Sequence, residues 1–219
     1  MAKITWDQTG TRLYETGVSK AVLYTKDETG KWVGVAWNGI TAITESPAGA
    51  ELSDLYADDI KYASLRSTET FGATIEAYTY PDEFMKCDGS AEAIPGVMFG
   101  QQSREYFCLS YVTKVGSDTE EADGDHYKLH LIYNATASPS EKAYQTVNDS
   151  PEAITFSWEV NTVAINVDGY KAMSTVTIDS GKVDATKLKA LEDKLYGTES
   201  EEPTIPMPNE IVTLLKTAA

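Results

Sequence analysis

The stretch that decides the fold is AITFSWEVN, residues 153–161, in which apolar and polar side chains alternate without interruption. The apolar positions are Ile154, Phe156, Trp158 and Val160, and the polar positions are Thr155, Ser157 and Glu159. A period of two residues is typical of a β-strand with one buried face, because successive side chains point to opposite sides of a sheet. We therefore predict a strand here, with the apolar set facing a core.

The same period recurs outward from this stretch in both directions. In FGATIEAYTY, residues 71–80, Phe71, Ala73, Ile75 and Ala77 alternate with Thr74 and Glu76. Further strands are predicted to start at residue 21 and to cover residues 31–44, 60–65, 104–114, 127–133 and 172–179. About eight or nine strands with turn signals between them favour an all-β fold, either a β-sandwich or a β-barrel.

One sizeable helix is predicted beside the strands. Asp184 is a good N-cap, Leu188, Leu191 and Leu195 form an apolar stripe, and Gly197 ends the helix. We expect residues 1–197 to form one domain and residues 198–219 to form an extended C-terminal arm, which docks on its own body or on a neighbour. The apolar arm residues expected to make contacts are Ile205, Met207, Ile211, Leu214 and Leu215.

Composition and charge exclude several classes of function. The chain has 219 residues, is 42% hydrophobic and carries a formal net charge of −16. Such a chain does not bind nucleic acid by neutralising phosphates, and it does not settle on anionic lipid, since both depend on Lys and Arg. No apolar run is long enough to span a membrane, and the N-terminus lacks the apolar stretch of a signal peptide.

Residues that could carry out chemistry give no coherent site. His126 and His130 are read as surface histidines, and Cys87 and Cys108 as free thiols. The acidic tip at residues 117–125, SDTEEADGD, is read as a solvated hairpin tip, with a weak cation site as the alternative. No nucleophile, phosphate-loop or dinucleotide motif is present. We therefore predict a structural or binding protein rather than an enzyme, with no metal and no cofactor.

A family resemblance is carried by several short stretches of sequence. They follow one another in the order typical of that family and are spread over nearly the whole chain. They are WDQTG (6–10), LYETG (13–17), GVAWNG (34–39), ESPAGAE (45–51), LYAD (55–58), FGATIEAYTYPDEF (71–84), CDGS (87–90), YKLHL (127–131), ATASPSEK (135–142) and NDSPEAITFSWE (148–159). Together they resemble the major tail proteins, or tail tube proteins, of long-tailed bacteriophages that infect Gram-positive bacteria.

This resemblance implies a β-sandwich with a helix at its flank. It implies that six copies form a ring, that each copy gives strands to a closed inner barrel, and that rings stack into the tail tube of the virion. Assembly would take place in the host bacterial cytoplasm. The implied partners are further copies of the chain and other tail proteins, such as the tape measure, distal tail and terminator proteins. DNA would pass through the lumen without specific binding, and no membrane would be involved.

The resemblance also implies roles for particular segments. A long loop between early strands reaches the adjacent ring, and residues 45–59 are the candidate, with Glu45, Pro47, Leu52, Leu55, Tyr56 and Asp58. The polar faces Thr74/Glu76 and Thr155/Ser157/Glu159 are lumen candidates, although either could face the outside of the tube. The alternatives are another ring component of a tail, a carbohydrate-binding β-sandwich and, more remotely, a hydrolase on a β scaffold.

Overall fold

The computed structural model describes residues 3–119, 121–122, 125–147, 149 and 152–216. Twelve strands, one 3-10 helix and two α-helices are assigned in these residues. They are β1 (Leu13–Lys26), β2 (Trp32–Ala36), β3 (Ile40–Glu45), β4 (Leu52–Ala57), β5 (Ile60–Arg66), β6 (Gly72–Ala77), η1 (Asp82–Phe84), β7 (Ala91–Ile94), β8 (Val97–Phe99), β9 (Phe107–Ser117), β10 (Tyr127–Ala137), β11 (Phe156–Thr162), β12 (Thr175–Asp179), α1 (Ala185–Tyr196) and α2 (Pro208–Leu215).

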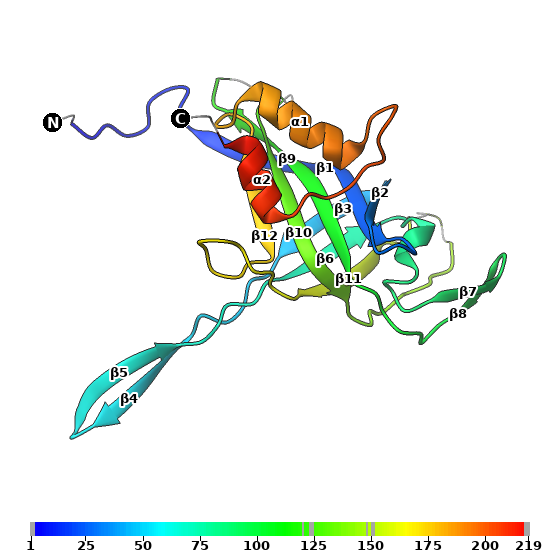
Figure 1. The fold of residues 1–219 in the computed structure, drawn as a ribbon, viewed down its shortest axis with the longest axis horizontal. Coiled ribbons are helices and arrows are strands. Elements are labelled where there is room, and N and C mark those ends of the chain that lie inside the picture. Colours follow the sequence, from blue (N-terminus) through cyan, green and yellow to red (C-terminus); the bar gives the residue numbers. More distant parts are fainter. Residues whose placement is uncertain (1–2, 120, 123–124, 148, 150–151, 217–219) are drawn as a thin grey trace.

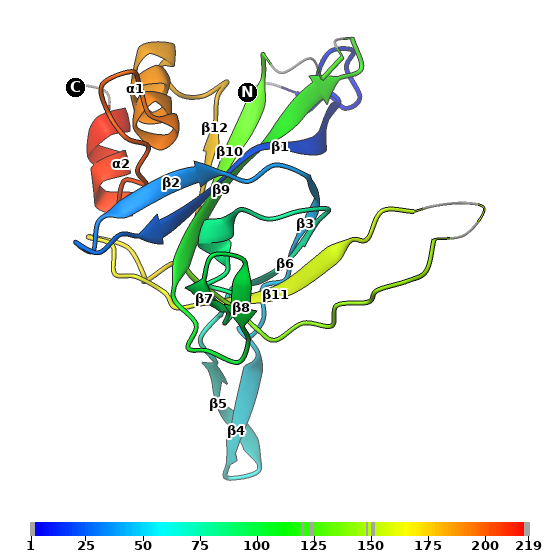
Figure 2. The ribbon, with the colours of Figure 1, turned by 90° about the vertical axis from the view of Figure 1, so that its right-hand side faces the viewer.

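Eight of these strands form one antiparallel sheet that curls over on itself (Figure 1, Figure 2). The strand order is β2-β1-β9-β10-β11-β6-β3, and β12 pairs with β10 beside β11. The prediction of an all-β fold with a flanking helix is confirmed. The two layers belong to one continuous sheet, and this sheet does not close into a barrel within the chain.

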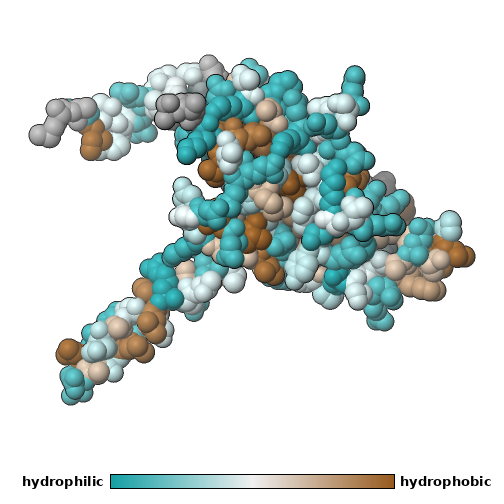
Figure 3. All heavy atoms as spheres, in the orientation of Figure 1, coloured by the Kyte–Doolittle hydropathy of each residue, from teal (hydrophilic) through white to brown (hydrophobic). Residues whose placement is uncertain are grey.

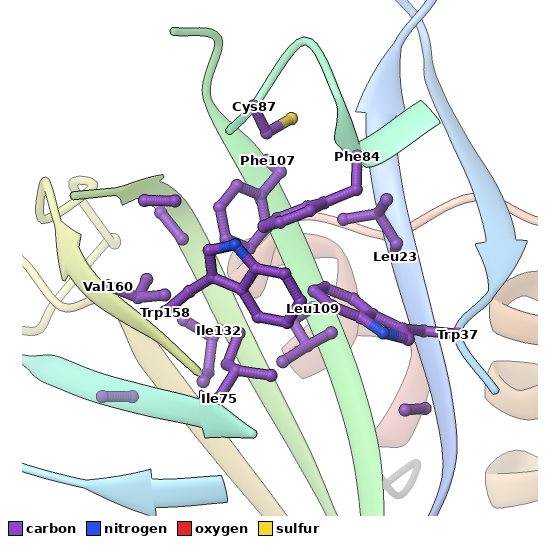
Figure 4. Close-up of a cluster of buried hydrophobic side chains, with 14 of the residues drawn as sticks. Leu23, Trp37, Ile75, Phe84, Cys87, Phe107, Leu109, Ile132, Trp158 and Val160 are labelled. Atoms are coloured by element: carbon purple, nitrogen blue, oxygen red, sulfur yellow. The ribbon is translucent and has the colours of Figure 1, made fainter. Parts of the chain in front are cut away.

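The curl encloses a first core between β3-β6-β11 and the β1-β9-β10 part of the sheet. Trp158 lies at its centre, with ring centroids 5.6 Å from Trp37 and 5.2 Å from Phe84 (Figure 4). Ile75 and Val160, on neighbouring strands, complete the inward face. The alternation that predicted these strands is confirmed within β6 and β11, since every second residue of each faces this core. The prediction is wrong for Ile154, which lies before β11 begins and is exposed.

A second core lies on the opposite face of β9 and β10, where α1 and α2 cover the sheet (Figure 1). Leu188, Leu191 and Leu195 of α1 are buried there. The predicted N-cap is confirmed, because the Asp184 carboxylate accepts hydrogen bonds from the backbone N–H groups of Thr186 and Lys187 at 3.1 and 3.2 Å. None of the helices in the described residues is long and apolar enough to cross a membrane.

Several elements differ from the prediction. The first strand, expected to start at residue 21, starts at Leu13. The single strand expected over residues 31–44 is two strands, β2 and β3, because the chain turns at Asn38–Gly39, where Gly39 has a φ of +81°. Residues 52–57, expected within a loop, form strand β4, and the strand expected at 60–65 pairs with it as β5 outside the main sheet. Two elements were not predicted, the hairpin β7–β8 and the helix α2.

Candidate assembly surfaces

The most prominent surface feature is the hairpin of β4 and β5, which projects from the body as a two-stranded ribbon (Figure 1, Figure 2). Its turn is Asp58–Asp59, and both residues have left-handed backbone angles, with φ of +50° and +59°. Two consecutive residues of this kind make the type of turn that matches the twist of paired strands, and Asp tolerates it better than most residues. The sequence therefore forms a tight hairpin where a loop was expected.

The projecting hairpin exposes many apolar side chains. Tyr56 and Tyr62 are 72% and 73% exposed, and the other large apolar residues of the ribbon that lie exposed are Leu52, Leu55, Ile60 and Leu65. Brown, hydrophobic residues lie along this projection in Figure 3. An isolated two-stranded ribbon is at best marginally stable in water, because it lacks a layer to pack against. A ribbon with this composition is suited to pack against another surface.

The root of the hairpin is fixed by backbone contacts. The N–H of Ser46 donates to the carbonyl of Gly72 at 2.8 Å, and Ala48 and Thr70 exchange two hydrogen bonds of 2.8 Å. A Cβ at Gly49 would lie 2.3 Å from the carbonyl oxygen of Thr68, so the close approach of the two strands requires glycine there. The hairpin therefore leaves the body in a defined direction.

A polar cluster ties the same root to the far layer of the curled sheet. The Tyr111 hydroxyl on β9 donates to the Glu45 carboxylate at the end of β3, with an O–O distance of 2.6 Å. His130 on β10 stacks on Tyr111 with ring centroids 4.7 Å apart, and its Nδ1 lies 3.8 Å from the Glu45 carboxylate. Burial lowers the pKa of His130, although the nearby carboxylates of Glu45 and Glu15 oppose this effect. His130 is thus not the surface histidine that the sequence suggested, since its side chain is 14% exposed.

The lumen candidates come from one patch of the sheet. In the β6–β11 register, Glu76 lies opposite Ser157, and Thr74 lies opposite Glu159. These four side chains share the face that points away from the first core, and both glutamates are exposed. Thr155 lies exposed just before β11. The structure therefore brings the two predicted polar faces together into one polar surface.

The described part of the C-terminal arm packs on its own chain. Ile205 and Ile211 are buried in the second core, Leu214 and Leu215 pack against it, and Met207 is exposed at the start of α2. The arm also covers the free edge of β2, where the Gly34 N–H donates to the Pro203 carbonyl at 2.9 Å and the Thr204 hydroxyl donates to the Trp32 carbonyl at 2.7 Å. Covering this edge prevents it from pairing with another strand.

The remaining candidates supply no reactive centre in the described residues. Both cysteines are free and buried, and burial raises the pKa of Cys108 to about 12, so its thiol is not poised as a nucleophile. Glu120 and Asp123 of the acidic tip lie outside the described residues. Among the described residues, no group of three or more His, Cys, Asp or Glu side chains is placed to hold a metal ion.

Sequence reasoning missed part of this surface. Ile60, Tyr62 and Leu65 belong to the predicted strand at 60–65 and fall outside the expected inter-ring loop at 45–59, whereas they lie on the projecting ribbon. The signal that could have placed them is the pair Asp58–Asp59 between two short strand-like runs, which favours a local hairpin over a long loop.

Comparison with known proteins gives loose likenesses in fold. No family model matches the chain, and no curated protein matches it. Among solved structures, the chain is similar to a chain from the cryo-electron microscopy structure of the anti-feeding prophage (AFP) baseplate. The TM-score is 0.38 and the sequence identity is 7%, and the match covers 80% of this chain and 97% of that one. It is also similar to a chain of the PVC sheath–tube complex, an extracellular contractile injection system in its extended state, with a TM-score of 0.33, 11% identity, and coverage of 80% and 94%. Neither likeness decides what this chain does.

Proposed function

We propose that this chain is a structural subunit that assembles with itself into stacked hexameric rings, forming the tail tube of a phage or a phage-derived particle. The observation that carries the proposal is the β4–β5 hairpin, which projects from the body with its large apolar side chains exposed. The hairpin includes Leu52, Leu55, Tyr56 and Asp58, the residues expected from the sequence resemblance to reach an adjacent ring. In this proposal Glu45 and Pro47 form its root.

The acidic character of the chain supports the same function. Six copies at −16 carry −96 per ring. The polar surface of Thr74, Glu76, Ser157 and Glu159 offers two exposed carboxylates per copy to a lumen. A wall of like charge repels DNA, so that a genome slides past without specific binding. The proposed place of action is the virion, after assembly in the host bacterial cytoplasm with tape measure, distal tail and terminator proteins as further partners.

The first test removes the hairpin. Glu51 and Ser67 are hydrogen-bonded to each other, with Ser67 N–H donating to the Glu51 carbonyl at 2.9 Å, so Asn-Gly can replace Leu52–Arg66 and close the chain there. We expect the variant to keep its thermal unfolding transition and to form no tubes by negative-stain electron microscopy over a concentration series. Tubes of normal length from this variant would rule out the hairpin as the contact between rings.

A side-chain version of the test has a matched control. The double variant Tyr56→Ser, Tyr62→Ser removes two exposed rings from the hairpin, and Tyr144→Ser, Tyr170→Ser removes two rings of similar exposure from elsewhere. The hairpin pair is expected to raise the lowest concentration at which tubes form, and the control pair is not. If the wild-type chain forms neither rings nor tubes at any concentration of the series, the proposed function is wrong.

A further inference from the structure

A cavity of about 460 Å³ opens beside β1 and β2, on a part of the body that the hairpin does not touch. Its apolar lining includes Val18, Val22, Trp37, Ile40 and Pro203, and Lys20 lies in the same lining. Trp37 and Val22 are buried, whereas Val18 and Ile40 are half-buried and Lys20 is exposed. The site is therefore an apolar hollow with an exposed cation on its lining.

The backbone of the lining indicates that the cavity is a functional position. Strand β1 bulges here, with register shifts between Thr16 and Val22, and Lys20 has a φ of +50°. A left-handed backbone is costly for lysine, and such strain is typically kept at functional positions.

The tip of the β4–β5 hairpin complements this cavity in polarity and charge. Tyr56 is an exposed aromatic side chain close to the turn, and the turn carries the Asp58 and Asp59 carboxylates. Lys61, directly across from Tyr56, is already paired with Asp54 at 2.8 Å. Burying an aromatic side chain removes about 150–250 Å² of surface from water. In a chain with a net charge of −16, two copies repel unless acidic tips meet cations. Lys20 supplies such a cation beside an apolar hollow.

The other exposed apolar projections fit less well. The β7–β8 hairpin ends in Ile94-Pro95-Gly96-Val97, and the Glu92 carboxylate at its turn is already engaged, because it accepts a hydrogen bond from the Gly96 N–H at 2.8 Å. Near the exposed Trp6, the Asp7 carboxylate is paired with Arg12 at 3.8 Å and Lys3 adds a further cation, so this segment offers no excess negative charge to Lys20. The β4–β5 tip joins apolar side chains to carboxylates, and it is therefore the occupant that the cavity favours.

The hairpin and the cavity lie at opposite ends of the molecule, so they cannot meet within one chain. Figure 1 shows the hairpin leaving at the lower left, whereas β2 and the end of α1, which border the cavity, lie at the upper right. When a projecting hairpin and the cavity that binds it lie at opposite ends of the same molecule, the contact between copies is head-to-tail, and it repeats from one copy to the next.

We propose that the cavity between β1, β2 and the end of α1 receives the β4–β5 tip of a second copy, with Tyr56 in the apolar hollow and the Asp58–Asp59 carboxylates facing Lys20. This inference rests on the proposed function and names the surface to which the hairpin of the adjacent ring binds.

A charge exchange tests the pairing. Lys20→Glu is expected to raise the minimal concentration for tube formation by about tenfold or more, because it sets a carboxylate against the acidic tip. Asp58→Lys alone should have a similar effect, and the double variant should recover most of the assembly. Lys171→Glu, the same change at an exposed lysine away from the cavity, is the matched control. No effect of Lys20→Glu, or no recovery in the double variant, would overturn the pairing.

Cross-linking gives a second readout that does not depend on charge. Because Cys87 and Cys108 are buried, cysteines introduced as Asp58→Cys and Lys20→Cys are the reactive thiols. Oxidation of assembled tubes should give a disulfide-linked ladder on a non-reducing gel, whereas Asp58→Cys with Lys171→Cys should stop at dimers. If hairpin removal abolishes tubes but the Asp58/Lys20 pair gives no ladder, the cavity is not the receptor and the proposed function stands. If the wild-type chain does not assemble, both fail.

Discussion

At the scale of single residues, His130 joins three parts of the fold. It stacks on Tyr111, accepts or donates a hydrogen bond with the Thr113 hydroxyl at 2.9 Å, and lies near the Glu45 carboxylate at the root of the hairpin. Because burial lowers its pKa, the neutral form is favoured in the folded state. The hairpin root is therefore held by the Tyr111 hydroxyl, and the neutral His130 ring stacks on the Tyr111 ring.

This gives a prediction for pH. A histidine with a lowered folded pKa binds protons more readily when unfolded, so stability is lost as pH falls below the ordinary value of 6.5 and towards the folded pKa. We expect the free energy of unfolding of the wild-type chain to fall between pH 7 and pH 5, and His130→Gln to flatten this part of the profile. Urea unfolding at each pH measures it. Equal slopes for the two proteins would contradict the assignment.

Some of these residues could be placed from sequence and others could not. The burial of Trp158, Ile75 and Val160 follows from alternation within a single strand. The position of His130 does not, since it depends on Tyr111 of the neighbouring strand and on Glu45 of the opposite layer. A local pattern shows which face a residue is on, but it does not show what lies across from it.

At the scale of elements, α1 is specified by its own sequence. The cap, the apolar stripe of Leu188, Leu191 and Leu195, and the end at Gly197 are all present as predicted. These signals are local, so they act without knowledge of the rest of the chain. The strands β4, β7 and β8 lack a buried face, and the periodicity that reveals a half-buried strand is therefore absent from them. Strand β5 was predicted, but its pairing with β4 outside the main sheet was not.

The cap of α1 can be tested directly. Asp184→Ala removes the acceptor for the Thr186 and Lys187 N–H groups and should lower the free energy of unfolding by about 1 kcal/mol. Asp184→Ser, which retains an acceptor, should lower it much less. Chemical denaturation followed by circular dichroism measures both values. A loss of the same size in the two variants would mean that the cap hydrogen bonds do not stabilise the helix.

At the scale of the whole molecule, the sheet has two different outer surfaces. The outer face of β6 and β11 is polar, whereas α1 and α2 cover the outer face of β9 and β10. Glu76 and Glu159 lie on that polar surface, on adjacent strands and away from the first core. Their side chains are exposed, so changing them should disturb the fold little. The surface can thus be altered in charge without removing buried contacts.

Reversing these charges tests the proposal that this surface lines a lumen. Glu76→Lys with Glu159→Lys should leave tube formation intact but lower the infectivity of assembled virions, because a basic wall attracts DNA that must slide past. The measurements are tube length by electron microscopy and plaque titre. Thr74→Ser with Ser157→Thr serves as a neutral control on the same face. Normal titres from the lysine variant would show that this surface does not line the lumen.

Residues 203–204 cover the free edge of β2, so this edge stays uncovered until the C-terminal part of the chain has been synthesised. Trp32 and Thr204, which share a hydrogen bond across that edge, are 172 residues apart. A ribosome adding roughly 5–20 residues per second makes this interval about 10–30 s. During it, β2 can pair with any strand it meets, including that of another nascent chain on the same messenger RNA. A chaperone that shields this edge during translation would raise the yield of correctly folded subunits.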